Sequence, residues 1–319
     1  MYGEIAAILT NVCFAFSFIL ARRIENEATP IFQNAIKATV GLLTFFIICL
    51  SFGVLLLVFS LSLFLILMLM MSVLFTVILG DTAYLHSQKI LGPAKALAIT
   101  TTSPFFTIIF ATLFLNRPFS ILMIFSGVLI GIGVIIITKE KTKKISNDTN
   151  PSFKNHNYGN QNKIKDKISL NTLKGTLWAT VAAVSWAIGI ALSDFSVNQV
   201  NLVLNLGILS TMIAMMIRFL FAASVLSIIA LIEGEKQPIL KSRNTWKILI
   251  ISAILSYSIG SLFFGEAVHI AGASFMSLIS TALPLFTIPF SYIINKEKIS
   301  KKGFLGVIIT LIGVILILF

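Results

Sequence analysis

Residues 80–118 of the chain read GDTAYLHSQKILGPAKALAITTTSPFFTIIFATLFLNRP, and residues 260–298 read GSLFFGEAVHIAGASFMSLISTALPLFTIPFSYIINKEK. The two stretches align at an offset of 180 positions. Glycine and proline occupy equivalent places in both: Gly80 and Gly260, Gly92 and Gly272, Pro104 and Pro284. Such matches carry weight, because glycine and proline have backbone roles that other residues fill poorly. The sequence therefore contains an internal repeat, which has to be recognised before a fold is assigned.

The repeat extends to the beginning of each half. Residues near the N-terminus match a second set at an offset of 172: Gly3, Ala7, Phe14 and Ala15 with Gly175, Ala179, Trp186 and Ala187. Lys37 matches Arg218 at an offset of 181. Small insertions between helices produce this drift in a duplicated sequence, so we expect two homologous halves.

The amino-acid composition is that of a membrane protein. Of 319 residues, 57% are hydrophobic and 11% are charged, and the mean hydropathy is +0.99. A soluble domain is about 45–50% apolar and about 25% charged, so this chain has too few polar side chains to cover a water-facing surface. The net charge of +12 lies mostly between apolar stretches without interleaved aromatic residues, which favours a lipid bilayer over nucleic acid as its partner.

Ten apolar stretches are long enough to cross a bilayer as helices, which takes about 20 residues each. The first half contributes 3–21, 30–52, 66–89, 93–115 and 119–138, and the second half contributes 175–195, 206–232, 246–269, 273–294 and 302–319. Residues 53–65 are also apolar and join the second and third spans. Because each half has an odd number of spans, the second half must enter the membrane from the opposite side.

The expected fold is an all-α polytopic membrane protein, with ten transmembrane helices in two inverted five-helix repeats. Many secondary transporters share this plan, with the substrate site between the repeats. The first repeat covers 1–138 and the second covers 175–319. Residues 139–174, between them, are rich in Lys and Asn and lack apolar periodicity. They cannot bury enough surface to offset their chain entropy, so we expect a disordered linker.

The repeated stretches resemble the EamA family of the drug/metabolite transporter superfamily. The likeness rests on a glycine-led turn, a small-residue helix with a central proline, and glycine-led first helices with Phe14 and Trp186 at the aromatic position. It implies a multi-pass protein of the cell membrane that moves a small metabolite, such as an amino acid or related compound, by alternating access and usually outward. One departure concerns an acidic residue after the fourth helix of each repeat: Glu297 is present, but the first half has Asn116.

Two basic residues lie within apolar spans, where a charge costs about 2.5–3.5 kcal/mol at a helix centre on insertion scales. Arg218 is about a dozen residues from either end of its span, which is about 18 Å of helix on each side. It is therefore expected to face a cavity and contribute to substrate binding. Lys37 is expected to do the same, although it lies seven residues past Pro30 and could instead extend to the interface. For both residues, a purely structural cation is the alternative.

Further candidates for substrate binding come from polar and aromatic residues in the spans. They are His86 and Glu266, together with Asn11, Trp186, Thr101 and Thr281. His86 and Glu266 occupy equivalent positions in the two halves, so they could approach one another or line opposite vestibules; hydrated residues at helix ends are the alternative. Trp178 and Ser185 are also considered, Trp178 with interfacial anchoring as its alternative role. Pro104 and Pro284 are expected to kink the middles of their helices, because each removes a backbone hydrogen bond.

The sequence contains no phosphate-binding glycine loop, no cluster with metal-ligand spacing and no nucleophile elbow. We therefore expect no enzyme, no cofactor and no metal. An intramembrane enzyme or a non-transport membrane scaffold are the alternatives, although the acidic and histidine residues in the spans are too scattered to form a recognisable catalytic set. Cys13 and Cys49 fit the role of small packing residues. A monomer and a homodimer are both compatible with the sequence.

Orientation follows from the basic residues, which mark cytoplasmic loops. Nearly all of them follow odd-numbered spans or lie in the linker, whereas Arg117 lies on the other side. The charge bias therefore places residues 139–174 in the cytoplasm and both termini outside. The family resemblance implies the reverse orientation, and we give the charge bias precedence because it acts physically during insertion.

Overall fold

The computed structural model describes residues 2–91, 96, 99–100, 102–115, 121–148, 158–232, 242–283, 285–287, 290 and 301–318. Over these residues the regular elements are helices. The first half contains α1 (Tyr2–Arg23), α2 (Pro30–Ser51), the 3₁₀-helix η1 (Leu55–Ser60), α3 (Leu63–Val73), the π-helix η2 (Leu74–Asp81), α4 (Thr82–Leu91), α6 (Ser103–Leu115) and α7 (Ile121–Asp148). The second half contains α8 (Tyr158–Leu204), α9 (Ile208–Ile232), α10 (Arg243–Ala253), the π-helix η3 (Ile254–Gly260), α11 (Ser261–Ile270), α12 (Gly272–Thr281) and α14 (Lys301–Leu318).

Within the described ranges, six helical stretches are long and apolar enough to cross a membrane. They are Tyr2–Arg23, Pro30–Ser51, Leu63–Leu91, Thr172–Leu204, Ile208–Ile232 and Arg243–Ile270. They correspond to the first three expected spans of each half, so these six predictions are confirmed as helices. The other four expected spans each include residues outside the described set.

Local capping explains where several of these helices begin. The Thr29 hydroxyl accepts a hydrogen bond from the backbone N–H of Phe32 at 3.3 Å, and Pro30 opens α2, where its missing N–H costs nothing. Ser62 caps α3 in the same way. The apolar connector 53–65 therefore ends at Ser62, and its middle forms the short helix η1.

Two spans change helix type at equivalent places. The stretch Leu63–Leu91 passes through η2, and Arg243–Ile270 passes through η3, which begins 180 positions later. In each, a hydroxyl donates to the carbonyl four residues before it, Thr76 to Ser72 at 2.9 Å and Ser256 to Ser252 at 2.7 Å. Short π-helical segments within α-helices often occur at functional sites.

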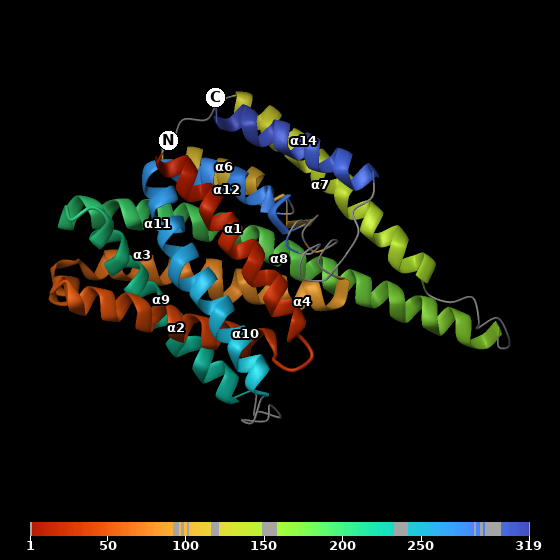
Figure 1. Cartoon of the computed structure of the whole chain (residues 1–319), viewed down its shortest axis with the longest axis horizontal. Coiled ribbons are helices and arrows are strands. Elements are labelled where there is room, and N and C mark those ends of the chain that lie inside the picture. The colour runs from red at the N-terminus through yellow and green to blue at the C-terminus, as the bar shows by residue number, and fades with distance from the viewer. Residues whose placement is uncertain are drawn as a thin grey trace.

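The first helix of each half packs against the other half (Figure 1). Helix α1 lies against η3, α10 and α11 of the second half, and α8 lies against α3, η2 and α4 of the first. Helix α2 packs on α9, and α7 runs beside α14. A Cβ added at Gly80 would lie 2.4 Å from Cδ1 of Trp186, and one at Gly260 would lie 2.9 Å from the ring of Phe14. Both glycines therefore permit a close aromatic contact from the other half.

Two expectations from the sequence differ from the structure. Helix α7 continues to Asp148 and α8 begins at Tyr158, so helix covers both ends of the segment 139–174 that we expected to be disordered. Adding residues to an existing helix avoids the cost of nucleation, and Lys is a good helix former. Residues 149–157 lie outside the described residues, and the role of 139–174 as a tether between the repeats stays a prediction.

The second difference concerns the central prolines. Pro104 is the second residue of α6, and Thr102 forms a turn just before that helix. Pro104 therefore starts a helix, where proline is well tolerated, and does not kink the middle of a continuous one. Helix α12 ends at Thr281 with a turn at Ala282, the position equivalent to Thr102. Pro284 itself lies outside the described residues.

Candidate functional site

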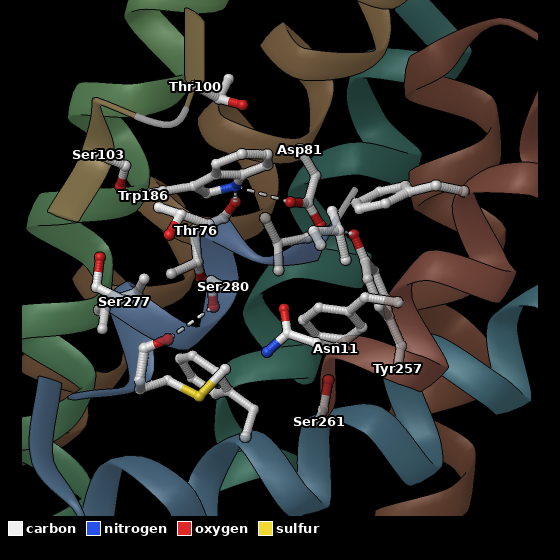
Figure 2. Close-up of a pocket in the computed structure, with 18 of the residues that line it drawn as sticks. Asn11, Thr76, Asp81, Thr100, Ser103, Trp186, Tyr257, Ser261, Ser277 and Ser280 are labelled. Carbon is white, nitrogen blue, oxygen red and sulfur yellow. Dashed lines mark hydrogen bonds between the residues drawn. The ribbon is translucent and has the colours of Figure 1, made fainter. Parts of the chain in front are cut away.

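A central pocket lies between the two halves. It encloses about 890 Å³, counted with its open mouth. Its walls come from α1, η2, Thr100 and the start of α6 in the first half, and from α8, α9, η3, α11 and α12 in the second. Figure 2 shows polar side chains converging on it from several helices. A largely apolar cavity with a few convergent polar groups has the character of a small-molecule site.

Asp81, the last residue of η2, supplies a carboxylate to the pocket wall. Its Oδ1 accepts a hydrogen bond from Nε1 of Trp186 at 2.9 Å, and its Oδ2 accepts one from the hydroxyl of Tyr257 at 2.6 Å (Figure 2). Trp186 belongs to α8 and Tyr257 to η3. A carboxylate from the first half is thus held by two neutral donors from the second.

Arg218, in the middle of α9, brings a guanidinium to the pocket, and its side chain is only 3% exposed. It donates to the hydroxyl of Ser193 and, at 3.0 Å, to that of Thr76. Its central carbon lies 5.4 Å from the centre of the Phe264 ring. Its Nε–H has no hydrogen-bond partner within the described part of the chain. Leaving a buried donor without a hydrogen bond costs about 1–3 kcal/mol. A ligand that supplies an acceptor to this N–H would therefore be stabilised in the pocket.

Lys37, on α2, lies just behind the pocket wall and is 1% exposed. Its Nζ is 5.9 Å from the ring centres of both Phe18 and Tyr257, which line the pocket. This distance is compatible with a cation–π attraction. Lys37 is therefore buried among aromatic rings and does not extend to the interface.

Hydroxyl groups of α12 form another part of the wall. Ser277 donates to the hydroxyl of Thr107 at 2.9 Å, and Ser280 donates to the carbonyl of Met276 at 2.8 Å. Thr281 donates to the carbonyl of Leu278 at 2.6 Å. On α1, the amide nitrogen of Asn11 donates to the carbonyl of Ala7 at 2.8 Å. Each hydroxyl has thereby used its one hydrogen, and these groups offer the pocket acceptor oxygens.

The structure brings half of the predicted binding residues to this pocket. Arg218, Asn11, Trp186 and Thr281 line it, and Lys37 stands behind it. Thr101 lies outside the described residues, whereas its neighbour Thr100 is part of the wall. The role of these residues in substrate binding stays a prediction.

His86 and Glu266 are not brought together, and neither lines the pocket. The ring of His86 stacks on Trp178, with the ring centres 5.2 Å apart. Glu266 accepts a hydrogen bond from Thr211 at 2.5 Å, which joins α11 to α9. Both residues contact neighbouring helices, so their equivalence in the repeat does not make them a pair.

The lining residues that sequence reasoning missed include Asp81 and Tyr257, which form the central hydrogen bonds between the halves. The repeat equivalent of Asp81 is Ser261, so the repeat offers no symmetric pair of acids, yet Ser261 lines the same pocket. The position of Asp81 within an apolar span was the available signal, since ionisable residues in spans usually face a cavity or a partner. Tyr257 gave no comparable signal, because a tyrosine in an apolar helix is ordinary and its partner is 176 positions away.

Comparisons with known proteins agree on a transporter. Two relatives are each named an uncharacterized transporter. The one from Clostridium kluyveri is 34% identical over 103 residues, which are 32% of this chain and 33% of that protein. The one from Methanothermobacter thermautotrophicus is 34% identical over 86 residues, 27% of this chain and 25% of that protein. The matched segments thus span a third or less of either relative's length.

The fold and the family are shared over a much larger part of the chain. A protein of known crystal structure superposes with a TM-score of 0.69 at 12% identity, covering 98% of this chain and 95% of that one, which is a likeness of fold alone. The model of the EamA-like transporter family matches residues 1–139 and 173–319, the two halves of the repeat. Together with the apolar helices this makes the chain an integral membrane protein. The chain belongs to the EamA-like transporter family, within the drug/metabolite transporter superfamily.

Proposed function

We propose that this protein is a secondary transporter of the cell membrane that exports a small metabolite by alternating access, and that it is not an enzyme. The central pocket is its substrate site. The observation that carries the proposal is the composition of the pocket wall. Helices of both halves contribute to it, and it holds the partly buried carboxylate of Asp81 and the buried guanidinium of Arg218, both far from the ends of their spans.

We further propose ten transmembrane helices in two inverted repeats. Three features support this arrangement. The π-helical segments η2 and η3 lie at equivalent positions, the first helix of each half packs on the third span of the other, and the turns at Thr102 and Ala282 interrupt equivalent helices beside the pocket. Transporters of the inverted-repeat class commonly place interrupted helices at the substrate site.

Transport is tested with purified protein in liposomes loaded with a panel of labelled metabolites. We expect at least one compound to cross the membrane chemically unchanged, and Arg218→Met to abolish its flux. The expected loss arises because methionine keeps much of the length of the side chain but removes the charge and the unpaired Nε–H.

The control is Ser224→Ala on the same helix, since Ser224 is exposed and only donates to the carbonyl of Leu220. Equal expression and equal thermal unfolding of the two variants would separate binding from folding. Unchanged flux through Arg218→Met would make Arg218 structural. Chemical conversion of a compound, in place of flux, would support the enzyme alternative.

A further inference from the structure

The charge of the pocket and the direction of its hydrogen bonds restrict what it can hold. Among the described residues that line or border it, three have side chains that are ordinarily charged at neutral pH: Arg218, Lys37 and Asp81. Asp194 and Glu266 are also buried, but neither lines the pocket: Asp194 accepts from the backbone of Ala273, and Glu266 accepts from Thr211. In their ordinary ionised forms, two cations and one carboxylate leave the pocket with one positive charge.

This positive charge is not cancelled by a contact between the groups. Both oxygens of Asp81 accept from the neutral donors Trp186 and Tyr257. Neither Arg218 nor Lys37 forms an ion pair with it in the described structure. Buried charge without a partner is unfavourable in a low-dielectric interior, so a ligand carrying one negative charge would bring the site to neutrality. A zwitterion carries no net charge and would leave the single positive charge of the pocket uncompensated.

Arg218 has the free donor that such an anion requires. Two of its N–H groups bond to Ser193 and Thr76, and its Nε–H has no partner among the described residues. A guanidinium binds a carboxylate through charge-assisted hydrogen bonds. The rings of Phe264, Phe14 and Phe18 stand in the same wall and suit an apolar body attached to the anion.

Several of the remaining polar groups present hydrogen-bond acceptors to the pocket. The hydroxyls of Ser280 and Thr281 donate to carbonyls of their own helix, and the amide nitrogen of Asn11 does the same. Thr100, Ser103 and Ser277 lie on one side of the view and Asn11 on the other (Figure 2). Because the single hydrogens of Ser280 and Thr281 are used within α12, their hydroxyl oxygens can accept from a ligand, and the amide oxygen of Asn11 is a further acceptor. A neutral O–H supplies that donor without adding positive charge.

We propose that the pocket binds a small hydroxylated organic monoanion, a hydroxycarboxylate with an apolar body. The proposal rests on the proposed function, because it assigns the substrate class of the transport site. The proposal distinguishes two classes of ligand of similar size. A hydroxycarboxylate matches the charge and the acceptors of this wall, whereas an amino acid, with its ammonium group, leaves the site positively charged.

The experiment uses one carbon skeleton with different polar groups. The purified full-length protein is titrated with 3-phenyllactate, phenylalanine, 3-phenylpropionate and phenylalaninol, and affinity is read from the ligand-induced rise in unfolding temperature. Phenyllactate is expected to bind at least about tenfold more tightly than phenylalanine, which corresponds to about 1.4 kcal/mol. It should also exceed phenylpropionate, which lacks the hydroxyl, and phenylalaninol, which lacks the carboxylate.

A charge variant tests the cause of the preference. Lys37→Met lowers the formal charge of the pocket to zero, so the preference for phenyllactate over phenylalanine should shrink at least about threefold, roughly 0.7 kcal/mol. Lys37→Arg keeps the charge and should keep the preference. If Lys37→Met does not fold, the order of the four affinities in the wild-type protein still tests the proposed ligand class. Lys37→Arg then tests whether the preference survives a change of side chain at constant charge.

Phenylalanine binding as tightly as phenyllactate would overturn the proposal, as would equal binding of phenylpropionate or no binding of any of the four compounds. Each of these results leaves the transport test with the metabolite panel intact. Conversely, the ordered binding of phenyllactate without flux of any compound through liposomes would reject the proposed function and keep the assignment of the ligand class.

Discussion

At the scale of single residues, the site depends on close contacts between the halves. Gly80 lies under the indole of Trp186, and the same indole donates to Asp81 and, at 3.2 Å, to the carbonyl of Thr76. The absence of a side chain at Gly80 lets the ring reach both acceptors. The position of the Asp81 carboxylate therefore depends partly on Gly80, which has no side chain of its own in the pocket.

We expect Gly80→Ala to destabilise the protein by about 1–3 kcal/mol. The added Cβ would lie 2.4 Å from Cδ1 of Trp186, so the ring or the helix has to move and the hydrogen bond to Asp81 is strained. Thermal unfolding in detergent measures the loss. Gly131→Ala is the matched control, because a Cβ there meets no atom within 4 Å. Equal unfolding temperatures of the two variants would contradict this account.

At the scale of elements, buried polar side chains join neighbouring helices. Oδ2 of Asp194, on α8, accepts from the backbone N–H of Ala273 at 3.0 Å, and Oδ1 accepts from Asn198 at 2.6 Å. Asn198 in turn bonds to His269 of α11 at 2.8 Å. The turn between α11 and α12 also needs Gly272, whose φ of 85° suits glycine. Helix α8 thus holds the connection that leads to the pocket wall on α12.

Asp194→Ala should lower the stability by roughly 0.5–2 kcal/mol, the usual cost of losing a helix N-terminal cap. Asp194→Asn keeps an oxygen that can accept from Ala273, and should lose less. Both variants are compared by thermal unfolding with the wild type. An Asn variant as unstable as the Ala variant would show that the charge of Asp194, and not its capping bond, matters.

The sequence predicts elements better than their interruptions. Five of the six apolar spans are predicted to within three residues at each end because each has a strong hydrophobic window, whereas the expected span 175–195 ends nine residues before the helical stretch Thr172–Leu204. The π-helical segments were not foreseen, since they depend on partners distant in the chain, such as the indole of Trp186 at the carbonyl of Thr76. Pro104 signalled a disturbance of its helix correctly, but the turn at Thr102 shows that a proline pattern alone does not distinguish a kink from a helix start.

The same holds for the site. Arg218 was predictable because a charge deep in a span needs a cavity or a partner, and it lines the pocket. Glu266 satisfied the same criterion, yet it bonds to Thr211 between helices. The sequence shows that a charged residue lies inside an apolar span. Whether that residue faces a cavity or a neighbouring helix depends on how the helices pack.

At the scale of the whole molecule, the packing of each half's first helix against the other half places the pocket on the boundary between them. Among the described residues of the segment 139–174, which joins the halves, none lines the pocket. The side of the membrane on which that segment lies defines the orientation of the protein. We propose that it is cytoplasmic, on the basis of the basic residues in the loops.

A cysteine at Ser152 tests this orientation in a background without the native Cys13 and Cys49. We expect a membrane-impermeant thiol reagent to leave it unlabelled in intact cells and to label it after permeabilisation, because the lipid bilayer would shield a cytoplasmic residue. A cysteine at an outward loop position such as Arg117 is the positive control. Labelling of the Ser152 variant in intact cells would reverse the orientation.

The unequal number of cations and carboxylates around the pocket also has an electrical consequence. A charge that moves across the full membrane potential changes its energy by about 2.3 kcal/mol per 100 mV. With Arg218, Lys37 and Asp81 ionised, the empty site is positive, and a cell interior at negative voltage draws it toward the cytoplasm. The same site loaded with a monoanion is neutral and nearly indifferent to voltage. The resting potential would then reset the empty carrier inward after each release, so the cell's voltage alone can drive outward movement of the cargo.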